Sequence, residues 1–409
     1  MCSVLYITFD GITDPLGRSQ ILPYLIGLSQ RGHTIHILSQ EKKDQLLVDK
    51  ESILNTLEKN GITWDYITYK NKPPIIQPLI QRNKIKQIAL DIVAKKNIEF
   101  THCRSYMAAW VGLKVKEKTG LPFLFDMRGF WADERKEGGL WPYKNPLYRA
   151  VYHHVKRLEK RLLWHANHIV SLTHRGKEII KGWNLSRDFS ISVIPCCADL
   201  KHFNPSLYSD EDRQRLRASY GLHQEDVVVG YVGSIGTWYM LDEMLDAFAL
   251  WQKKIPNLKL FFLSRISLNE LQPKLKSRDI PIESVRVQST SYDHVPKHMA
   301  IFDVGLFFIL PVFSKAASSP VKQGEMLSMG LPVVCNAGVG DTDRVIEEID
   351  RSLLVDGFDS RAYEKVLHVL QNKTYRENMG PLCQATAKRW FDVQQGIDSY
   401  HTIYTKITQ

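Results

Sequence analysis

Apolar residues along the chain fall into short continuous runs, separated by longer segments of helical period. The strands expected in the first half lie at 4–9, 34–38, 64–69, 100–103 and 121–125, with helices at 19–30, 53–59 and 83–95. Those expected in the second half lie at 227–232, 258–263, 304–309 and 332–336, with a helix at 241–252. Strands that alternate with helices predict parallel sheets of the α/β class.

Each half opens with a strand that breaks into a glycine loop and then a helix. The first loop, 10–17, carries Gly11 and Gly17, and the second, 233–237, carries Gly233 and Gly236. In a doubly wound sheet this loop is where ligands bind, although one such loop alone can simply close a turn. The pair predicts two Rossmann-like domains facing each other across a cleft.

We expect three regions along the chain, with a boundary in the turn-rich segment 195–212. Residues 1–200 are expected to form an N-terminal Rossmann-like domain, which binds the acceptor. Residues 201–385 are expected to form a second Rossmann-like domain, which binds the donor. A last helical segment, 386–409, is rich in aromatic residues and is expected to pack back toward the N-terminal domain.

Length and composition are those of a globular protein, since 409 residues with 44% hydrophobic content can fill two interiors. The six cysteines form no CxxC pair, which predicts reduced thiols and no metal site. The N-terminus lacks signal-peptide features, and the longest apolar stretch, 304–313, is too short to span a bilayer. We therefore expect a cytoplasmic protein.

The net charge of +10 favours an anionic partner. Basic residues gather between 142 and 181, against only Glu159 and Glu178: Lys144, Arg149, Lys156, Arg157, Lys160, Arg161, Arg175, Lys177 and Lys181. They form either a solvated helix face or a surface for anionic lipid, worth about 1 kcal/mol per residue near headgroups. The apolar and basic segment 70–96 adds to the membrane interpretation. The chain shows no nucleic-acid-binding motif, so nucleic acid is the least favoured partner.

Segment 318–332 carries the most informative chemistry. Ser319 is the expected N-cap and Pro320 the first residue of a helix that Gly330 ends. Because a buried strand is expected at 306–310, this helix begins at the carboxyl edge of the sheet and offers free N–H groups to a phosphate. Lys322 and Glu325 share one face. The lysine can pair with a phosphate, and the carboxylate can accept hydrogen bonds from two ribose hydroxyls. A surface ion pair is the alternative.

This segment resembles the donor-binding segment of retaining glycosyltransferases of family 4, which have the GT-B fold. Further stretches resemble a bacterial branch of that family that builds polysaccharides. They are 14–20 with 22–24, 126–131, 233–239, and Glu159 followed by 166–170 and 193–195. The resemblance runs almost from end to end.

The resemblance implies roles for individual residues. Glu325 matches the second glutamate of the paired-glutamate motif of the family and would hold the ribose. Lys322 and the backbone at 338–341 would meet the diphosphate and the sugar. The donor-binding residues that we expect are Gly17, Ser234, Tyr239, Arg265, Ser319, Lys322, Glu325, Gly340 and Asp341.

The chain departs from the pattern of the family at three places. The first glutamate of the pair falls on Ala317. The arginine and lysine that commonly follow the first C-domain strand fall near Ser234 and Tyr239. Arg128 stands where many members have a histidine before glycine. We therefore expect Lys322, with Arg128 or Arg265, to meet the phosphate charge.

Glycosyl transfer builds negative charge on the leaving diphosphate, which a fixed cation and a helix N-terminus stabilise by about 2.7–4 kcal/mol per donor. We expect Arg128, Asp126 and Lys322 to be catalytic, with no cofactor and no metal. On the acceptor side, Asp133, Glu134 and Trp131 follow an N-domain strand, and the acids either orient an acceptor hydroxyl or belong to an ordinary charged loop. The sequence 341–343 mimics a metal-binding DxD, but following a glycine turn it is expected to cap a helix.

The function expected from the sequence is that of a glycosyltransferase of the EC 2.4 class. It would move a sugar from a nucleotide sugar to a glycan or lipid-linked acceptor, with retention, in surface polysaccharide synthesis at the inner face of the cell membrane. Two alternatives stay open. One is a nucleotide-sugar 2-epimerase, which needs no acceptor, and the other is a scaffold that binds a nucleotide sugar without catalysis.

Overall fold

The computed structural model describes residues 1–70, 76–185 and 189–408, and the chain divides into two compact units. Unit 1 comprises Met1–Pro195 and Val393–Gln409, and unit 2 comprises Cys196–Asp392. The division falls at Pro195 and Asp392 rather than at 200 and 385. Residues 196–200 belong to unit 2 because Ala198 pairs with Asp392 and the amide of Cys196 donates to Ser319.

Unit 1 is built, in its described residues, on a seven-stranded parallel sheet of order β3-β2-β1-β4-β5-β6-β7. The strands are β1 Ser3–Ile7, β2 Thr34–Glu41, β3 Thr63–Thr68, β4 Phe100–Arg104, β5 Phe123–Asp126, β6 His168–Ser171 and β7 Ile191–Val193. The helices are α1 Pro15–Gln20, α2 Leu22–Gln30, α3 Lys43–Lys59, α4 Ile76–Lys95, α5 Ser105–Thr119, α6 Trp131–Glu137, α7 Pro146–His165, α8 His174–Gly182 and α18 Val393–Ile407. The central strands β4 and β5 are buried along their whole length, although β4 carries Thr101, His102 and Arg104.

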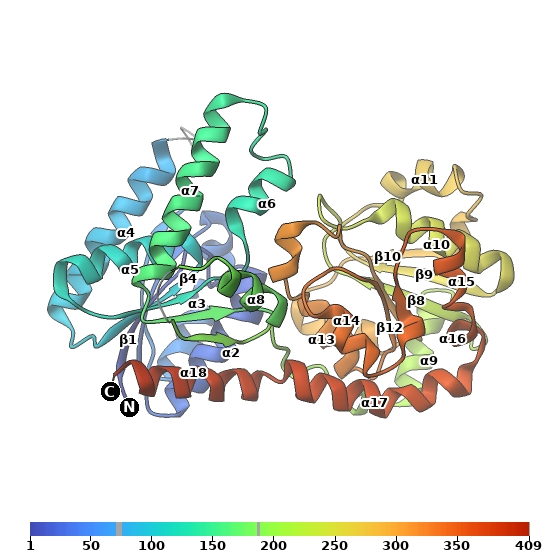
Figure 1. Cartoon of the computed structure of the whole chain (residues 1–409). Coiled ribbons are helices and arrows are strands. Elements are labelled where there is room, and N and C mark those ends of the chain that lie inside the picture. The colour runs from blue at the N-terminus through green and yellow to red at the C-terminus, as the bar shows by residue number, and fades with distance from the viewer. Residues whose placement is uncertain (71–75, 186–188, 409) are drawn as a thin grey trace. The chain divides into compact units, whose positions relative to one another are not determined.

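The last helix of the chain, α18, completes the core of unit 1 and lies beside α2 (Figure 1). Gly27 of α2 permits this close packing, because a Cβ atom there would lie 2.3 Å from Ile397. The rings of Tyr400 and Tyr404 are buried beside His102. Residues 393–409 are thus structural members of unit 1.

Unit 2, all of whose residues are described, is built on a six-stranded parallel sheet of order β10-β9-β8-β11-β12-β13. The strands are β8 Val227–Val232, β9 Leu258–Leu263, β10 Val285–Gln288, β11 Val304–Phe307, β12 Val333–Asn336 and β13 Leu354–Val355. The α-helices are α9 Asp210–Ser219, α10 Leu241–Lys254, α11 Leu268–Lys276, α12 Val295–Met299, α13 Val321–Ser328, α14 Thr342–Glu347, α15 Ser360–Glu364, α16 Leu367–Gln371 and α17 Lys373–Phe391. Short 3₁₀ turns are η1 Pro205–Leu207, η2 Ile282–Ser284, η3 Tyr292–His294, η4 Phe313–Ala317 and η5 Arg351–Leu353.

The core of unit 2 fills with large side chains around this sheet, among them Trp251, Phe261 and Phe262. Helix α13 packs against α17, and Gly324 allows the approach because a Cβ atom there would lie 2.8 Å from Phe391 (Figure 1). This packing fixes α13, the helix that carries the candidate site.

The alternation of strand and helix is confirmed, while several boundaries differ from those predicted. The expected helix 19–30 begins at Pro15 and is interrupted at Ile21. The last helical segment is two helices, α17 and α18, separated at Asp392. All six cysteines are buried and free. No helix in the described residues has the length and apolar character needed to cross a membrane. Residues 71–75 of the predicted lipid-binding segment lie outside the described residues.

Candidate functional site

The carboxyl ends of β8, β11 and β12 bring three loops of unit 2 together. The glycine loop after β8 runs into Tyr239, which bridges to Ile309 beyond β11. The loop after β12 is tied to the β11 loop, because the amide of Gly340 donates to the carbonyl of Lys315 at 2.8 Å. Helix α13 begins beside these loops, at the sheet edge where parallel α/β folds bind their ligands.

Helix α13 begins at Val321, one residue later than predicted. Pro320 is the N-cap residue, with extended dihedral angles, and no side chain caps the helix. Ser319 is therefore not the N-cap. Its hydroxyl instead accepts a hydrogen bond from the amide of Cys196 at 3.2 Å, which ties the start of unit 2 to this loop. The helix ends as predicted, with Gly330 in the left-handed region at φ 74°.

Lys322 and Glu325 are buried, with exposed fractions of 8% and 7%, so they do not form a surface ion pair. The ammonium of Lys322 donates to the Tyr231 hydroxyl at 3.1 Å and lies 3.8 Å from the centre of the Tyr239 ring. Burial lowers the pKa of Lys322 to about 7, which the charge of Glu325 partly opposes. Burial likewise raises the pKa of Glu325 to about 7, partly opposed by Lys322. The pair is held in a desolvated pocket of tyrosine rings.

The neighbours of this pair include several other predicted residues. Burial raises the pKa of Tyr239, with smaller contributions from Cys196 and Glu325. The loop bends toward the lysine at Gly233, where φ is 110° and a Cβ atom would lie 3.3 Å from Lys322 Nζ. Ser234 is exposed, and its carbonyl accepts from the Tyr231 hydroxyl at 2.7 Å. Arg265, after β9, is exposed.

The acidic sequence at 341–343 is held by a glycine turn. Asp341 occupies the N-cap position of α14, but its side chain does not cap the helix. Asp343 accepts from the amide of Gly338 at 3.1 Å, which closes the glycine turn and does not cap the helix. Among the described residues, no group of three or more His, Cys, Asp or Glu side chains is placed to hold a metal ion.

Sequence reasoning missed Lys315, which is 7% exposed. Its ammonium lies 3.9 Å from the centre of the Trp238 ring. The sequence could have indicated this residue, because Lys315 stands beside small residues that are expected to be buried. A lysine is rarely buried unless its ammonium has a partner.

In unit 1, charged side chains gather at the carboxyl ends of β4 and β5. The Asp126 carboxylate is 1% exposed. Its Oδ2 lies 3.8 Å from Arg104 Nη1 and 3.7 Å from Arg128 Nη1. The same oxygen accepts from the Tyr400 hydroxyl at 3.2 Å. Desolvation opposes ionisation of Asp126, but Arg128 and its other neighbours hold the pKa of the carboxyl below its usual value. Arg128 has a left-handed backbone, with φ 59°.

The predicted loop 10–17 is fixed by a residue that sequence reasoning missed, Glu41. Its buried carboxylate accepts from the amides of Ile12 at 2.9 Å and Thr13 at 3.2 Å. Gly17 packs against this loop, and a Cβ atom there would lie 2.1 Å from the carbonyl of Gly11. The role of Gly17 toward phosphate stays a prediction.

The predicted acceptor residues lie on α6. Asp133 is buried and accepts from the Tyr152 hydroxyl at 2.7 Å and from the Lys156 ammonium at 2.8 Å. Trp131 packs edge-on against Trp141. Glu134 is half-buried in the same turn. Both Asp133 oxygens are thus engaged within unit 1, whatever the acceptor.

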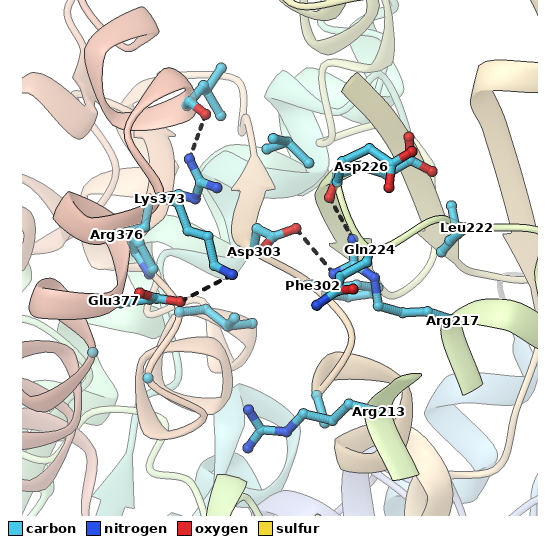
Figure 2. Close-up of a pocket in the computed structure, with 18 of the residues that line it drawn as sticks. Arg213, Arg217, Leu222, Gln224, Asp226, Phe302, Asp303, Lys373, Arg376 and Glu377 are labelled. Atoms are coloured by element: carbon cyan, nitrogen blue, oxygen red, sulfur yellow. Dashed lines mark hydrogen bonds and ion pairs between the residues drawn. The ribbon is translucent and has the colours of Figure 1, made fainter. Parts of the chain in front are cut away.

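A cavity of about 1310 Å³ lies at the amino edge of the unit 2 sheet, where Val227 begins β8 and Asp303 precedes β11. Figure 2 shows part of its lining, with Asp303 labelled. Arg217 extends toward Asp303 at 3.4 Å (Figure 2). Arg376 donates to the carbonyl of Val369 at 3.0 Å. Both arginines thus have partners within unit 2 and contribute to its structure. Since ligands of parallel α/β sheets bind at the carboxyl edge, this cavity is not the candidate site.

Comparison with known families divides the chain in the same way as the structure. Residues 24–202 match the model described as Glycosyltransferase Family 4, and residues 212–382 match the model described as Glycosyl transferases group 1. The alpha-monoglucosyldiacylglycerol synthase of Acholeplasma laidlawii is 20% identical in an alignment of 340 residues, which covers 77% of this chain and 79% of that protein.

Solved structures resemble the whole chain. Sucrose-phosphate synthase of Thermosynechococcus elongatus has a TM-score of 0.73 at 15% identity and covers 100% of this chain and 99% of its own. HepE of Anabaena, solved in complex with UDP-glucose, has a TM-score of 0.70 at 16% identity and covers 99% of this chain and 100% of its own. At these identities the structures show the fold.

Proposed function

Because the chain belongs to the glycosyltransferases of the family 4 type, with the GT-B fold of two Rossmann-like domains, we propose that it moves a sugar from a nucleotide sugar to a hydroxyl of a glycan or lipid-linked acceptor. The placement of Lys322 and Glu325 carries this proposal. A desolvated ammonium beside a desolvated carboxylate suits a ligand that has phosphate next to ribose. HepE of Anabaena binds UDP-glucose, which supports a donor of this class.

The chemistry follows from the charge that develops on the leaving diphosphate. Lys322, held on two tyrosine rings, is fixed before the reaction and needs no reorganisation to stabilise that charge. We propose that Arg128 and Asp126 of unit 1 take part, that the anomeric configuration is retained, and that no metal is required. Ser234, Tyr239, Arg265, Gly340 and Asp341 belong to the proposed donor-binding loops.

We further propose peripheral contact with an anionic membrane, in keeping with a lipid-linked acceptor and polysaccharide synthesis. Helix α7 exposes Arg149, Arg157 and Lys160 on its outer face. Leu147 and Trp164 of the same helix are 58% and 41% exposed. Basic and apolar groups on one helix are typical of interfacial binding. Co-sedimentation with phosphatidylglycerol vesicles tests this proposal, and no binding at low salt would disprove it.

Calorimetry with UDP, GDP and ADP tests the donor site, and an assay with the matching nucleotide sugars and a lipid-linked acceptor tests the reaction. Transfer with release of nucleoside diphosphate supports the proposal, and NMR of the new glycosidic bond tests retention. An epimerised donor without transfer would favour the epimerase alternative. Nucleotide binding without either reaction would favour the scaffold.

A further inference from the structure

The last helix of the chain reaches the charged edge of unit 1 through one hydroxyl group. Tyr400 of α18 donates to Asp126 Oδ2 at 3.2 Å. Among the described residues, this hydroxyl is the side-chain group nearest to that carboxylate, His102 Nε2 lies 3.7 Å from the same oxygen, and Asp126 Oδ1 has no hydrogen-bond partner. The arginine nitrogens lie at 3.7 and 3.8 Å, where attraction is strong but less directional.

The donor of this hydrogen bond is itself rigidly placed. Ile397 packs against Gly27, and the Tyr404 hydroxyl lies 2.7 Å from Nδ1 of His102. The Tyr400 ring is 3% exposed and meets the Tyr24 ring edge-on. A hydroxyl fixed by packing on both sides can set the orientation of the carboxylate that it contacts.

The carboxylate in turn faces a residue in an unfavourable backbone conformation. Arg128, at φ 59°, occupies a region that costs a non-glycine residue about 1–2 kcal/mol and persists only where the surroundings hold it. Asp126 stands two residues before it, and their side chains are 3.7 Å apart. The Asp126 carboxylate is therefore one of the groups that hold the Arg128 guanidinium in place.

We propose that Tyr400 is a positioning residue, which fixes Asp126 and, through it, the Arg128 guanidinium at the carboxyl edge of unit 1. The inference rests on the proposed function, in which Arg128 takes part in transfer. The C-terminal helix would then contribute to the reaction as well as to the core. A residue that only fills the core would affect stability and leave the turnover of the folded enzyme unchanged.

The experiment measures release of UDP from UDP-glucose and of GDP from GDP-mannose by the full chain, in the presence of a lipid-linked acceptor whose hydroxyl takes the sugar. Tyr400→Phe removes the hydroxyl alone, and Tyr24→Phe is the matched control, since its hydroxyl contacts the carbonyl of Pro195. We expect Tyr400→Phe to lower kcat about tenfold, with the donor KM changed less than about twofold, because lost orientation acts on the transition state. Tyr24→Phe should turn over at the wild-type rate.

A double-mutant cycle with Arg128→Lys shows whether the two residues act together. If Tyr400 acts through Arg128, the double variant loses no more activity than Arg128→Lys alone. Additive losses, or full activity of Tyr400→Phe in an active enzyme, would overturn the inference and leave the proposed function in place. Release from neither donor by the wild type would overturn the proposed donor reaction and the inference with it. Should Tyr400→Phe not fold by circular dichroism, Tyr400→Met, which also lacks the hydroxyl, replaces it in the same cycle under the same criteria.

Discussion

The carboxyl edge of the unit 1 sheet gathers two aspartates and two arginines that neutralise one another, whereas the corresponding edge of unit 2 holds a lysine against tyrosine rings. In unit 1, Arg104 Nε donates to Asp10 at 3.1 Å, and Asp126 lies near both arginines. In unit 2, Lys322 and Glu325 are each destabilised as ions by burial. The same strand order thus carries a paired set of charges in unit 1 and, in unit 2, two ions that burial disfavours.

The difference predicts which property of each unit, folding stability or ligand binding, changes when its charged residues are replaced. Removing one member of a buried, paired set leaves an uncompensated charge and costs folding free energy. Lys322 and Glu325 are both disfavoured as ions by burial, so replacing the two together should cost binding while it relieves the empty protein. Substitutions that leave a buried charge of unit 1 unpaired should therefore lower stability, and substitutions at Lys322 or Glu325 should lower nucleotide affinity.

The largest stability effect is expected at Lys156 in unit 1. Its ammonium contacts Asp133 at 2.8 Å and also pairs with the fully buried Glu159. Lys156→Met leaves two acids without their cation and should lower the free energy of unfolding by about 3–5 kcal/mol. Chemical denaturation measures this, with the exposed Lys160→Met as control. Equal stability of the two variants would contradict the prediction.

Glu325→Ala tests unit 2. The substitution removes the acceptor proposed for ribose. It should weaken nucleoside diphosphate binding at least about 100-fold, because the ribose hydroxyls would then be buried without a hydrogen-bond partner. Titration calorimetry measures it, and circular dichroism verifies the fold. Unchanged nucleotide affinity would remove Glu325 from the donor site.

The double variant Lys322→Met with Glu325→Gln tests the linkage to pH. The raised pKa of Glu325 makes its contribution to stability fall as pH rises from 4.5 toward 7. The lowered pKa of Lys322 makes its contribution fall as pH drops from 10.5 toward 7. The wild type is therefore penalised most near pH 7, where we expect the double variant to be more stable by about 2 kcal/mol.

Urea unfolding of the wild type and the double variant between pH 5 and 9 measures this difference. It should be largest near pH 7 and shrink on both sides. A difference that does not vary with pH would mean that the pair is not desolvated as the structure indicates.

Ser105→Gly tests backbone strain at the carboxyl end of β4, in the charged edge of unit 1. Ser105 follows Arg104 and has φ 68°, a conformation that glycine adopts without penalty. The substitution should raise the free energy of unfolding by about 0.5–1 kcal/mol. Ser105→Ala keeps the penalty and serves as control, so a similar gain for both would show that the backbone is not strained there.

The smallest effect is expected at Arg265. It is exposed after β9, so Arg265→Ala should weaken nucleotide binding less than about fivefold. Calorimetry at low and moderate salt measures it. A loss as large as that of Glu325→Ala would place Arg265 among the principal phosphate-binding residues.

The sequence predicted those features that depend on neighbouring residues. The strands β8 and β9 match their predicted ranges, because continuous apolar runs are buried on both faces. The spacing of Lys322 and Glu325 placed them on one face of a short helix. The N-cap was misplaced by one residue because Ser319 is used for a contact with Cys196, which periodicity does not reveal.

The residues that were missed act across long separations in the chain. Tyr400 meets Asp126 over 274 positions, and Arg104 meets Asp10 over 94. Glu41 lies at the end of β2, yet it holds the loop that follows β1. Such contacts follow from the order of strands in the sheet, and no local pattern predicts that order.

The chain leaves unit 1 at Pro195 and returns to it at Val393, which has a consequence for biosynthesis. The ribosome delivers the strands of unit 1 first, but Ile397, Tyr400 and Tyr404, which close its core, are translated only after all of unit 2. Unit 2 emerges whole before that helix does. The usual order, in which the leading domain matures first, is therefore reversed. A nascent chain stalled before residue 393 should carry a finished second unit behind an unfinished first one.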